Sequence, residues 1–288
     1  MLEQLNAEFA IADVLMFEKH SSGLIQGKIS STTCTGTFFL LGGHVAEYAL
    51  QPSRPILFMS EAANFEVGKA IRGGVPVCFP WFGPHKTDSN QPAHGLVRTE
   101  EWKVKAASFD GETVAVELGY ELPNSTLNYK LQFGRSLQLE MTVTNRAAAS
   151  SFELALHTYF AVSNSAEVEI QGLESQNYLD QLTGKTISAT GQSIQFREET
   201  DRIYHGSVEA IRLIDDSWNR QIVVRPTNSE STVIWNPWID KSKRMPDFGD
   251  LEYPHMCCIE TANITPNQIN LDTGQEHTTS LQIEELNL

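Results

Sequence analysis

Residues 137–144 read LQLEMTVT, with a large apolar side chain at every second position and polar side chains between them. Successive side chains of a β-strand point to opposite faces, so this alternation predicts a strand with one buried face. Residues 114–120, VAVELGY, repeat the pattern. Shorter runs that we also expect to form strands lie at residues 37–41, 168–170, 222–224, 232–235 and 279–283.

Turn-forming residues separate these runs, as in Asp110-Gly111 and Thr183-Gly184. No long stretch has the period of an amphipathic helix, although residues 2–10 suit a short one. Many short strands between turns predict an all-β fold, an antiparallel sandwich or barrel. All-β domains reach 288 residues as one unit and no linker or repeat interrupts the chain, so we expect a single domain over residues 1–288.

The composition is that of a globular protein with a large negative charge. Hydrophobic residues make up 41% and charged residues 20%, and the formal net charge is −15. This charge repels nucleic acids and anionic membranes, so we expect neither as a partner. It also repels phosphorylated metabolites, so a phosphate site would need its own arginines. Residues 1–17 do not resemble a signal peptide and no apolar run is long enough to span a membrane, so we expect a cytoplasmic protein.

Motifs for metals, nucleotides and disulfides are missing from the sequence. The four cysteines, Cys34, Cys78, Cys257 and Cys258, have no CxxC spacing, and adjacent residues on a strand point apart, so we expect reduced thiols. The eight histidines show no HxxxH-type or HxH chelating spacing, and no phosphate-binding loop or nucleophile elbow occurs. The sequence therefore predicts neither a metal nor a cofactor.

Residues 72–98 contain too many glycines, prolines and aromatic residues for strand alternation, which indicates a long ordered loop of a kind that often carries function. Arg72 and Arg98 lie at its ends and could clamp an anion. His94, followed by a glycine, could donate a hydrogen bond to a sugar oxygen. A rigid aromatic loop, with Arg72 paired to an acid and His94 in a structural role, explains the same residues.

Two further candidates lie on predicted strands. Within residues 152–160, FELALHTYF, alternation places His157 opposite the apolar Leu156 and on the same face as Glu153 and Tyr159. A histidine there can exchange protons near neutral pH, or can simply donate to a backbone carbonyl. Glu260 interrupts the apolar run MCCIETAN at residues 256–263. Partial burial would raise its pKa toward the range of a general base, whereas a glutamate on an edge strand would face solvent.

Asp201, in TDRIY at residues 200–204, is a weaker candidate because a solvated ion pair would account for it. The residues alone thus predict a β-rich protein with arginine, histidine and carboxylate candidates, and they do not name a reaction.

Taken together and in order, these segments resemble the hexose-6-phosphate mutarotases, or glucose-6-phosphate 1-epimerases, of the aldose 1-epimerase (galactose mutarotase-like) superfamily. The motifs that carry the resemblance are RGGVP at 72–76, FP at 79–80, FG at 82–83, HGLVR at 94–98, LHTYF at 156–160, TDRIY at 200–204, WNP at 235–237 and IETAN at 259–263. They span nearly the whole chain.

The resemblance implies a large antiparallel β-sandwich and a cofactor-free isomerase that interconverts the α and β anomers of a hexose 6-phosphate. Separately, nothing in the sequence pattern indicates a large apolar interface, so we expect a monomer. By the same resemblance Glu260 removes the proton of the C1 hydroxyl and a charged His157 protonates the ring oxygen. The residues implied to bind the substrate are Arg72, His94, Arg98 and Asp201. Family members often have glutamine where Ala93 stands, so one hydrogen bond to the sugar is expected to be missing.

Two rival functions fit a sandwich of this type. A carbohydrate-binding module without catalysis would use Trp81, Phe82 and Trp235 as stacking surfaces and would need no acid and base. A glycoside hydrolase or lyase would need two carboxyl groups about 5 to 9.5 Å apart. A phosphorylated substrate is expected because a mutarotase for free sugars would not need both Arg72 and Arg98.

Overall fold

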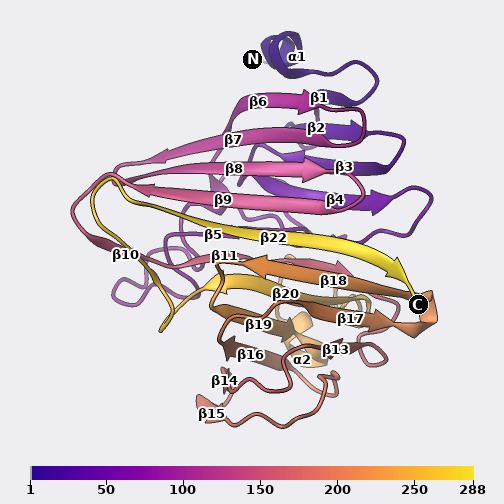
Figure 1. The fold of residues 1–288 in the computed structure, drawn as a ribbon, viewed down its shortest axis with the longest axis vertical. Coiled ribbons are helices and arrows are strands. Elements are labelled where there is room, and N and C mark those ends of the chain that lie inside the picture. Colours follow the sequence, from indigo (N-terminus) through magenta and orange to yellow (C-terminus); the bar gives the residue numbers. More distant parts are fainter. Residues whose placement is uncertain (1) are drawn as a thin grey trace.

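The alternating segments form two strands of one of the two eight-stranded sheets, called here the large sheet, in the computed structural model, which describes residues 2–288 (Figure 1). Residues 137–144 lie in β9 (Leu137–Asn145), whose apolar side chains are all buried, and residues 114–120 lie in β7 (Val114–Leu122). All strands in this sheet pair antiparallel, in the order β13-β17-β18-β22-β9-β8-β7-β6. The remaining members are β13 (Glu169–Gln171), β17 (Ile211–Asp215), β18 (Arg220–Thr227), β22 (Glu276–Asn287), β8 (Ser125–Phe133) and β6 (Lys103–Phe109).

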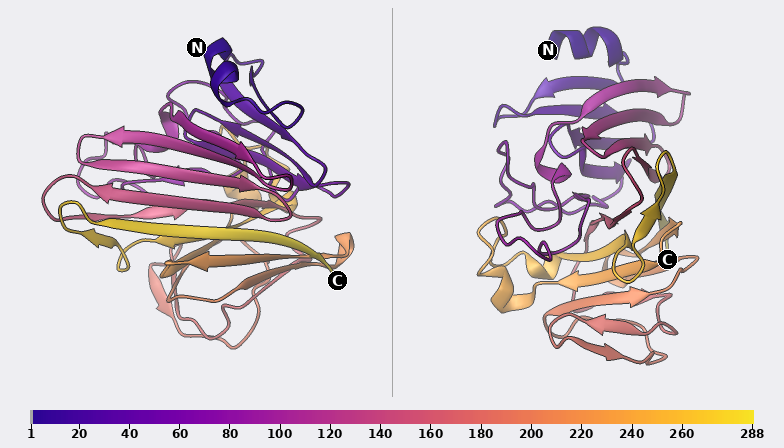
Figure 2. Two further views of the ribbon diagram at one scale, coloured as in Figure 1. Left: turned by 45° about the horizontal axis from the view of Figure 1, so that its top comes forward. Right: turned by 90° about the vertical axis from the view of Figure 1, so that its left-hand side faces the viewer.

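Two sheets make up the second layer of the sandwich (Figures 1 and 2). The first has the order β1-β2-β3-β4, with β1 (Leu15–Lys19), β2 (Ile25–Ser30), β3 (Cys34–Phe39) and β4 (His44–Leu50). The second has the order β15-β14-β16-β19-β20-β11-β5, and β12 also pairs with β20. Its strands are β15 (Lys185–Ile187), β14 (Tyr178–Asp180), β16 (Thr200–His205), β19 (Ser231–Asn236), β20 (Met256–Asn263), β11 (Leu154–Leu156), β5 (Val77–Cys78) and β12 (Tyr159–Ala161).

The core lies between the two layers. One buried cluster extends from Leu15 to Ile283 and takes Leu139 from the large sheet, Phe38 from the four-stranded sheet and Ile259 from the sheet that holds β20. β3 contacts β8, and β20 contacts β22, so both sheets of the second layer touch the large sheet. The fold is therefore the antiparallel β-sandwich that the sequence predicts.

Helices are few and short in the described chain. They are α1 (Leu2–Phe9), which confirms the short early helix, α2 (Trp238–Ser242), and the 3₁₀ turns η1 (Val97–Thr99), η2 (Asp216–Trp218) and η3 (Tyr253–His255). None of the helices over residues 2–288 has the length and apolar character that a membrane crossing requires. A small sheet pairs β10 (Ser150–Phe152) with β21 (Ile269–Leu271). All four cysteines are free and buried, as expected.

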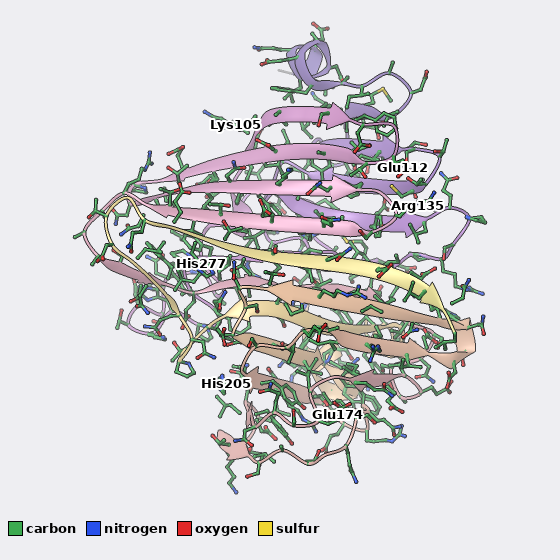
Figure 3. The ribbon with its side chains drawn as sticks, in the orientation of Figure 1. Lys105, Glu112, Arg135, Glu174, His205 and His277 are labelled. Carbon is green, nitrogen blue, oxygen red and sulfur yellow. The ribbon has the colours of Figure 1, made fainter. Side chains whose placement is uncertain are left out.

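The edge strand β6 contains an irregularity that limits pairing with other chains. Its register with β7 shifts between Val104 and Ala106, which leaves Lys105 out of the regular ladder at the edge of the sheet (Figure 3). A bulge that carries a lysine is a common protection of an exposed strand edge.

Candidate active site

A cleft of about 340 Å³ lies over the sheet that contains β20. Arg72, His94, His157, Asp201 and Glu260, all expected from the sequence to belong to the site, line this cleft. The long loop, which contains only β5 and η1 as regular elements, supplies Arg72 and His94. The sandwich thus brings together residues from distant parts of the chain.

Glu260 is held by a strand that is buried along its whole length. Every residue of β20 is buried, and both edges of the strand are paired, one with β19 and the other with β11 and β12. Only 1% of Glu260 is exposed, so the interpretation as a solvent-facing glutamate is wrong. Cys257 packs in the main core and Cys258 in a separate cluster, which confirms that the adjacent thiols point apart.

His157 lies in the break between β11 and β12, and both of these short strands are hydrogen-bonded to β20. Its backbone N–H donates to the carbonyl of Pro76 over 3.0 Å, which fixes it to the loop. Leu154 and Leu156 point into the main core, and the imidazole is on the other face as alternation predicts. The local pattern therefore places the ring correctly, although the strand is interrupted.

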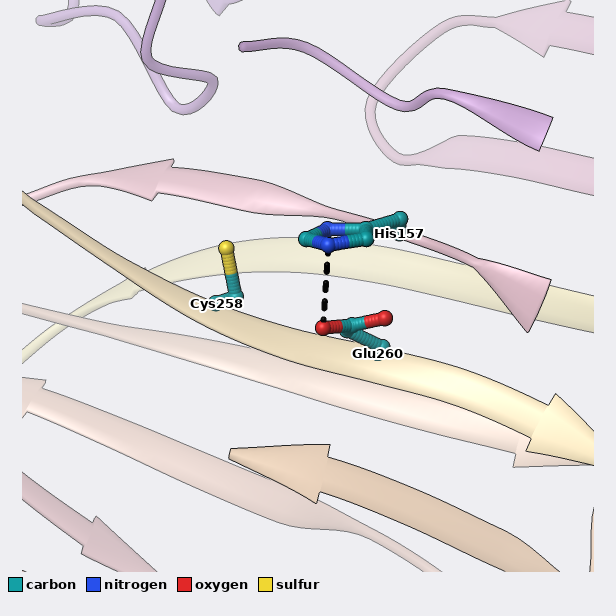
Figure 4. A group of neighbouring side chains, drawn as sticks. All are labelled: His157, Cys258 and Glu260. Carbon is teal, nitrogen blue, oxygen red and sulfur yellow. Dashed lines mark ion pairs between the residues drawn. The ribbon is translucent and has the colours of Figure 1, made fainter. Parts of the chain in front are cut away.

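The imidazole and the carboxylate meet in the cleft. His157 Nε2 lies 3.3 Å from Glu260 Oε1 (Figure 4). His157 Nδ1 and Glu260 Oε2 are buried and have no hydrogen-bond partner among the described residues. A donor and acceptor pair with spare polar atoms is suited to exchange protons with a bound molecule.

Burial shifts the two pKa values in opposite directions. It raises the pKa of Glu260 well above its ordinary value, and the negative charge of Asp201 adds to the effect. It lowers the pKa of His157 well below its ordinary value, assisted by the positive charges of Arg72 and Arg98. Each shift favours the uncharged form, so burial works against a permanent ion pair across the 3.3 Å contact. His157 and Glu260 therefore titrate together, and one proton can be shared between Nε2 and Oε1.

Aromatic rings surround the imidazole. Tyr159 stacks on His157 with ring centroids 4.8 Å apart, and Trp235 lies edge-on at 6.2 Å. The Tyr159 hydroxyl accepts a hydrogen bond of 2.9 Å from Arg72 Nη1. The guanidinium of Arg72 also pairs with Asp247, Nη2 to Oδ2, at 3.0 Å. Arg72 is thus paired to an acid, as one interpretation of the sequence held, and it lines the cleft as well.

His94 adopts a left-handed backbone conformation with φ 64°, and Gly95 follows with φ 82°. Burial lowers the pKa of His94 to about 3, helped by the charges of Arg98 and Arg72, so the ring is neutral. The N–H of Gly83 points to His94 Nδ1 at 3.4 Å, which makes Nδ1 an acceptor and places the ring proton on Nε2. This tautomer can donate a hydrogen bond to a sugar oxygen.

Lys241 is a functional candidate that the sequence did not reveal. Its Nζ lies 3.7 Å from Asp201 Oδ2, 3.2 Å from Glu199 Oε1 and 5.7 Å from the ring centre of Trp235. The available signal was its place in α2, directly after the WNP motif at residues 235–237. Gln181, also missed, donates to Asp201 Oδ1 at 2.8 Å.

Arg98 does not line the cleft. Its guanidinium donates to the carbonyl of Ala93 over 2.8 Å, and its buried Nε has no partner among the described residues. The positive charge of Arg98 adds to burial in lowering the pKa of His44 to about 3. A direct contact between Arg98 and a substrate therefore stays a prediction.

One group in the described chain has the composition of a metal site. Ligand atoms of His157, Cys258 and Glu260 lie within 4.8 Å of one another (Figure 4), and zinc binds such nitrogen, sulfur and oxygen donors. Cys258 is fully buried and does not line the cleft, and burial raises the pKa of its thiol well above the ordinary value. A metal needs the thiolate, so the protonated thiol makes this a poor site and we assign no metal to it.

Fold and site define the class of protein. The chain belongs to the family described as aldose 1-epimerase, whose model matches residues 28–284. The predicted fold is confirmed by a galactose 1-epimerase from Lactobacillus acidophilus, which superimposes with a TM-score of 0.74 over 95% of this chain and 98% of that one, at 12% identity.

Other proteins share more sequence with this chain than the galactose 1-epimerase does. A protein of Cenchrus ciliaris named "Putative glucose-6-phosphate 1-epimerase" is 32% identical over 263 residues, covering 84% of this chain and 79% of its own. A protein of the same name from Escherichia coli K12 is 32% identical over 244 residues, 81% of each chain. The crystal structure described as "a putative mutarotase (YeaD)" from Salmonella typhimurium superimposes over all of both chains, with a TM-score of 0.91 and 25% identity.

Proposed function

We propose that this protein is a hexose-6-phosphate mutarotase that interconverts the α and β anomers of glucose 6-phosphate and related hexose 6-phosphates. The observation that carries the proposal is the buried contact of 3.3 Å between His157 Nε2 and Glu260 Oε1 in a cleft that also contains cations. The names of the relatives point to the phosphorylated sugar. We treat the whole chain as one domain, because a single core cluster runs from Leu15 to Ile283.

Mutarotation needs one proton removed and one proton supplied. Glu260, as the carboxylate, accepts the proton of the C1 hydroxyl while His157, as the imidazolium, gives a proton to the ring oxygen. The bond between C1 and the ring oxygen breaks, an aldehyde forms at C1, and the C1–C2 bond rotates. The hydroxyl at C5 then attacks the other face of the aldehyde, and both protons return. No atom changes oxidation state, so a positioned acid and base suffice.

The mechanism requires Glu260 as a carboxylate and His157 as an imidazolium, and a single proton transfer between them produces both. Burial favours the proton on Glu260, and moving it across the 3.3 Å contact to His157 creates the carboxylate and the imidazolium together. The pair remains neutral overall, so the transfer avoids placing a net charge in the buried site. A phosphate bound in the cleft would stabilise the imidazolium further.

Arg72 and Lys241 are the cations proposed to hold the phosphate, and the charge of Arg98, which does not line the cleft, acts on His94 and His157. The formal net charge of −15 repels an anionic substrate at long range. Cations in the cleft act on the phosphate at hydrogen-bonding distance. There their attraction outweighs the repulsion by the net charge of the protein, which salt screens at long range. His94 and Asp201 are proposed to bind the hydroxyl groups of the sugar.

The deciding experiment is magnetisation-transfer NMR of anomer exchange in glucose 6-phosphate, with glucose and galactose measured in parallel. We expect exchange of the phosphate to be accelerated far more than exchange of the free sugars. Acceleration of the free sugars alone would discard the phosphate site. Saturable binding without acceleration would replace the enzyme with a sugar-binding module.

A further inference from the structure

Glu153 lies between β10 and β11, on the chain segment that leads to His157, and its side chain is only 9% exposed. It does not line the cleft. The carboxylate nevertheless contacts two segments that matter to the site. One is the loop that forms part of the cleft wall, and the other follows β20, the strand that carries Glu260.

The carboxylate is surrounded by donors. Oε2 accepts the backbone N–H of Phe82 at 2.9 Å. Oε1 accepts Lys86 Nζ at 3.0 Å and the backbone N–H of Thr265 at 3.1 Å, together with the Thr265 hydroxyl. In return, the backbone N–H of Glu153 donates to the carbonyl of Pro80 at 3.0 Å. The loop is therefore tied to Glu153, just before β11, at three points: Pro80, Phe82 and Lys86.

The bond to Phe82 leads directly into the cleft. Phe82, Gly83 and Pro84 form one stretch of its wall. The ring of Phe82 lies edge-on to His94 at 4.8 Å, and His94 lies edge-on to His157 at 5.7 Å. A shift of the Phe82 backbone would consequently move the ring of His94.

The carboxylate also connects the loop with the end of the catalytic strand. Thr265 follows β20, which carries Glu260. Burial by itself raises the pKa of Glu153, but hydrogen bonds from Phe82, Thr265 and Lys86 outweigh it and leave the pKa below its ordinary value. The group is thus an anion that only accepts hydrogen bonds.

We propose that Glu153 is a positioning residue, which holds the cleft wall at Phe82–Pro84, and through it His94, against the sugar. The kinetic consequence rests on the proposed mutarotase activity, whereas the structural consequence does not. Substitution by glutamine distinguishes the roles of the two carboxylate oxygens, because an amide keeps one acceptor oxygen and replaces the other with a donor nitrogen. With that oxygen facing Thr265 and Lys86, the amide nitrogen faces the N–H of Phe82, and this hydrogen bond is lost.

The test is Glu153→Gln, studied by anomer-exchange kinetics and by hydrogen–deuterium exchange. We expect KM for glucose 6-phosphate to rise about 10- to 100-fold, the cost of a displaced binding group, with a much smaller change in kcat because His157 and Glu260 keep their positions beside and on β20. Amide exchange in residues 80–86 should become at least several-fold faster, while exchange in β20 stays slow.

Glu174→Gln is the matched control (Figure 3). The Glu174 carboxylate accepts the backbone N–H of Gly172 at 3.0 and 2.9 Å, and neither residue lines the cleft. This variant should keep the wild-type KM and the wild-type exchange in residues 80–86. Equal changes in both variants would overturn the proposal, and so would an unchanged KM and unchanged exchange in Glu153→Gln.

Milder changes keep the proposal testable if Glu153→Gln does not fold. Lys86→Met removes an ammonium group that is 65% exposed, and Thr265→Val removes only the hydroxyl donor. Combined, they should accelerate exchange in residues 80–86 above the wild-type rate, and wild-type exchange there would contradict the proposal. Should the wild-type protein fail to accelerate anomer exchange, the proposed function fails, and the amide measurement still decides the role of Glu153.

Discussion

The ring of His157 lies almost parallel to the ring of Tyr159, with centroids 4.8 Å apart and an interplanar angle of 10°. The same tyrosine accepts a hydrogen bond from Arg72. One phenol therefore orients the proposed acid through its ring and a proposed phosphate ligand through its hydroxyl. These two effects can be separated by substitution.

Tyr159→Phe keeps the stacked ring and removes the hydroxyl. We expect KM for glucose 6-phosphate to rise about five-fold, the value of one ordinary hydrogen bond, with little change in kcat. Tyr159→Leu also removes the flat surface against His157, so kcat should fall by about ten-fold or more as the imidazole loses its fixed orientation. Steady-state kinetics on both variants is the measurement, and an equal fall in kcat would show that the ring does not orient His157.

Replacing either member of the catalytic pair tests the proposed chemistry. Glu260→Gln and His157→Asn should each lower kcat by about 10²- to 10⁴-fold, since each removes one proton-transfer group. Far-ultraviolet circular dichroism should show an unchanged β-sheet spectrum in both. Turnover near the wild-type rate would remove the substituted residue from the mechanism.

The same glutamate predicts a pH-dependent stability. Its pKa is raised in the folded state, so its contribution to stability is complete below the unfolded pKa of about 4.3 and is lost as the pH rises toward the folded value. Over that window each pH unit costs the wild-type protein up to about 1.4 kcal/mol, and Glu260→Gln avoids this cost. Urea unfolding at several pH values from 4.5 to 8 should show the variant gaining stability over the wild type as the pH rises. A difference that stays constant would mean that Glu260 titrates normally.

Much of this arrangement follows from sequence pattern. The alternation at residues 137–144 predicts β9, and the face of His157 follows from its neighbours because burial of one face is a local property. The burial of Glu260 could not be decided in this way. Its strand is buried on both faces, so all eight residues of β20 are covered and no alternation marks the carboxylate.

Contacts between segments that are distant along the chain also could not be predicted from the sequence. Asp247, the partner of Arg72, is 175 positions away along the chain, and no period or motif connects the two. Lys241 enters the cleft because α2 folds beside β16, which pattern alone does not predict. Arg98 illustrates the opposite case, since it belongs to the HGLVR motif at residues 94–98 and does not line the cleft.

Lys241 provides a test of phosphate recognition. Lys241→Met should raise KM for glucose 6-phosphate by about 10- to 100-fold, as expected for a charged hydrogen bond, and should leave KM for any free sugar that turns over unchanged. Lys243→Met, which alters an exposed lysine that does not line the cleft, is the control and should behave as wild type. An equal loss on phosphorylated and free sugars would argue against a phosphate contact.

The left-handed turn at His94 depends on the glycine that follows it. A Cβ at Gly95 would lie 2.0 Å from the carbonyl oxygen of Phe79, and its φ is +82°. We expect Gly95→Ala to lower the free energy of unfolding by at least about 3 kcal/mol, through both strain and overlap. Gly191→Ala, at φ +69° with nothing within 4 Å, should cost only about 1–2 kcal/mol for the backbone conformation. Urea unfolding measures the free energy of unfolding of both variants. Equal losses would show that the overlap with the Phe79 carbonyl does not contribute to the cost at Gly95.

Glu260 lies on the buried β20 and His157 lies between two strands that pair with β20, whereas Phe82 and Lys241 come from a loop and a short helix. On heating, proton-transfer geometry should therefore survive until the whole sandwich melts, while affinity for the substrate begins to fall earlier as the surrounding segments loosen. In evolution the same division lets changes in the surrounding segments adjust which sugar is accepted, without altering the groups that move the protons.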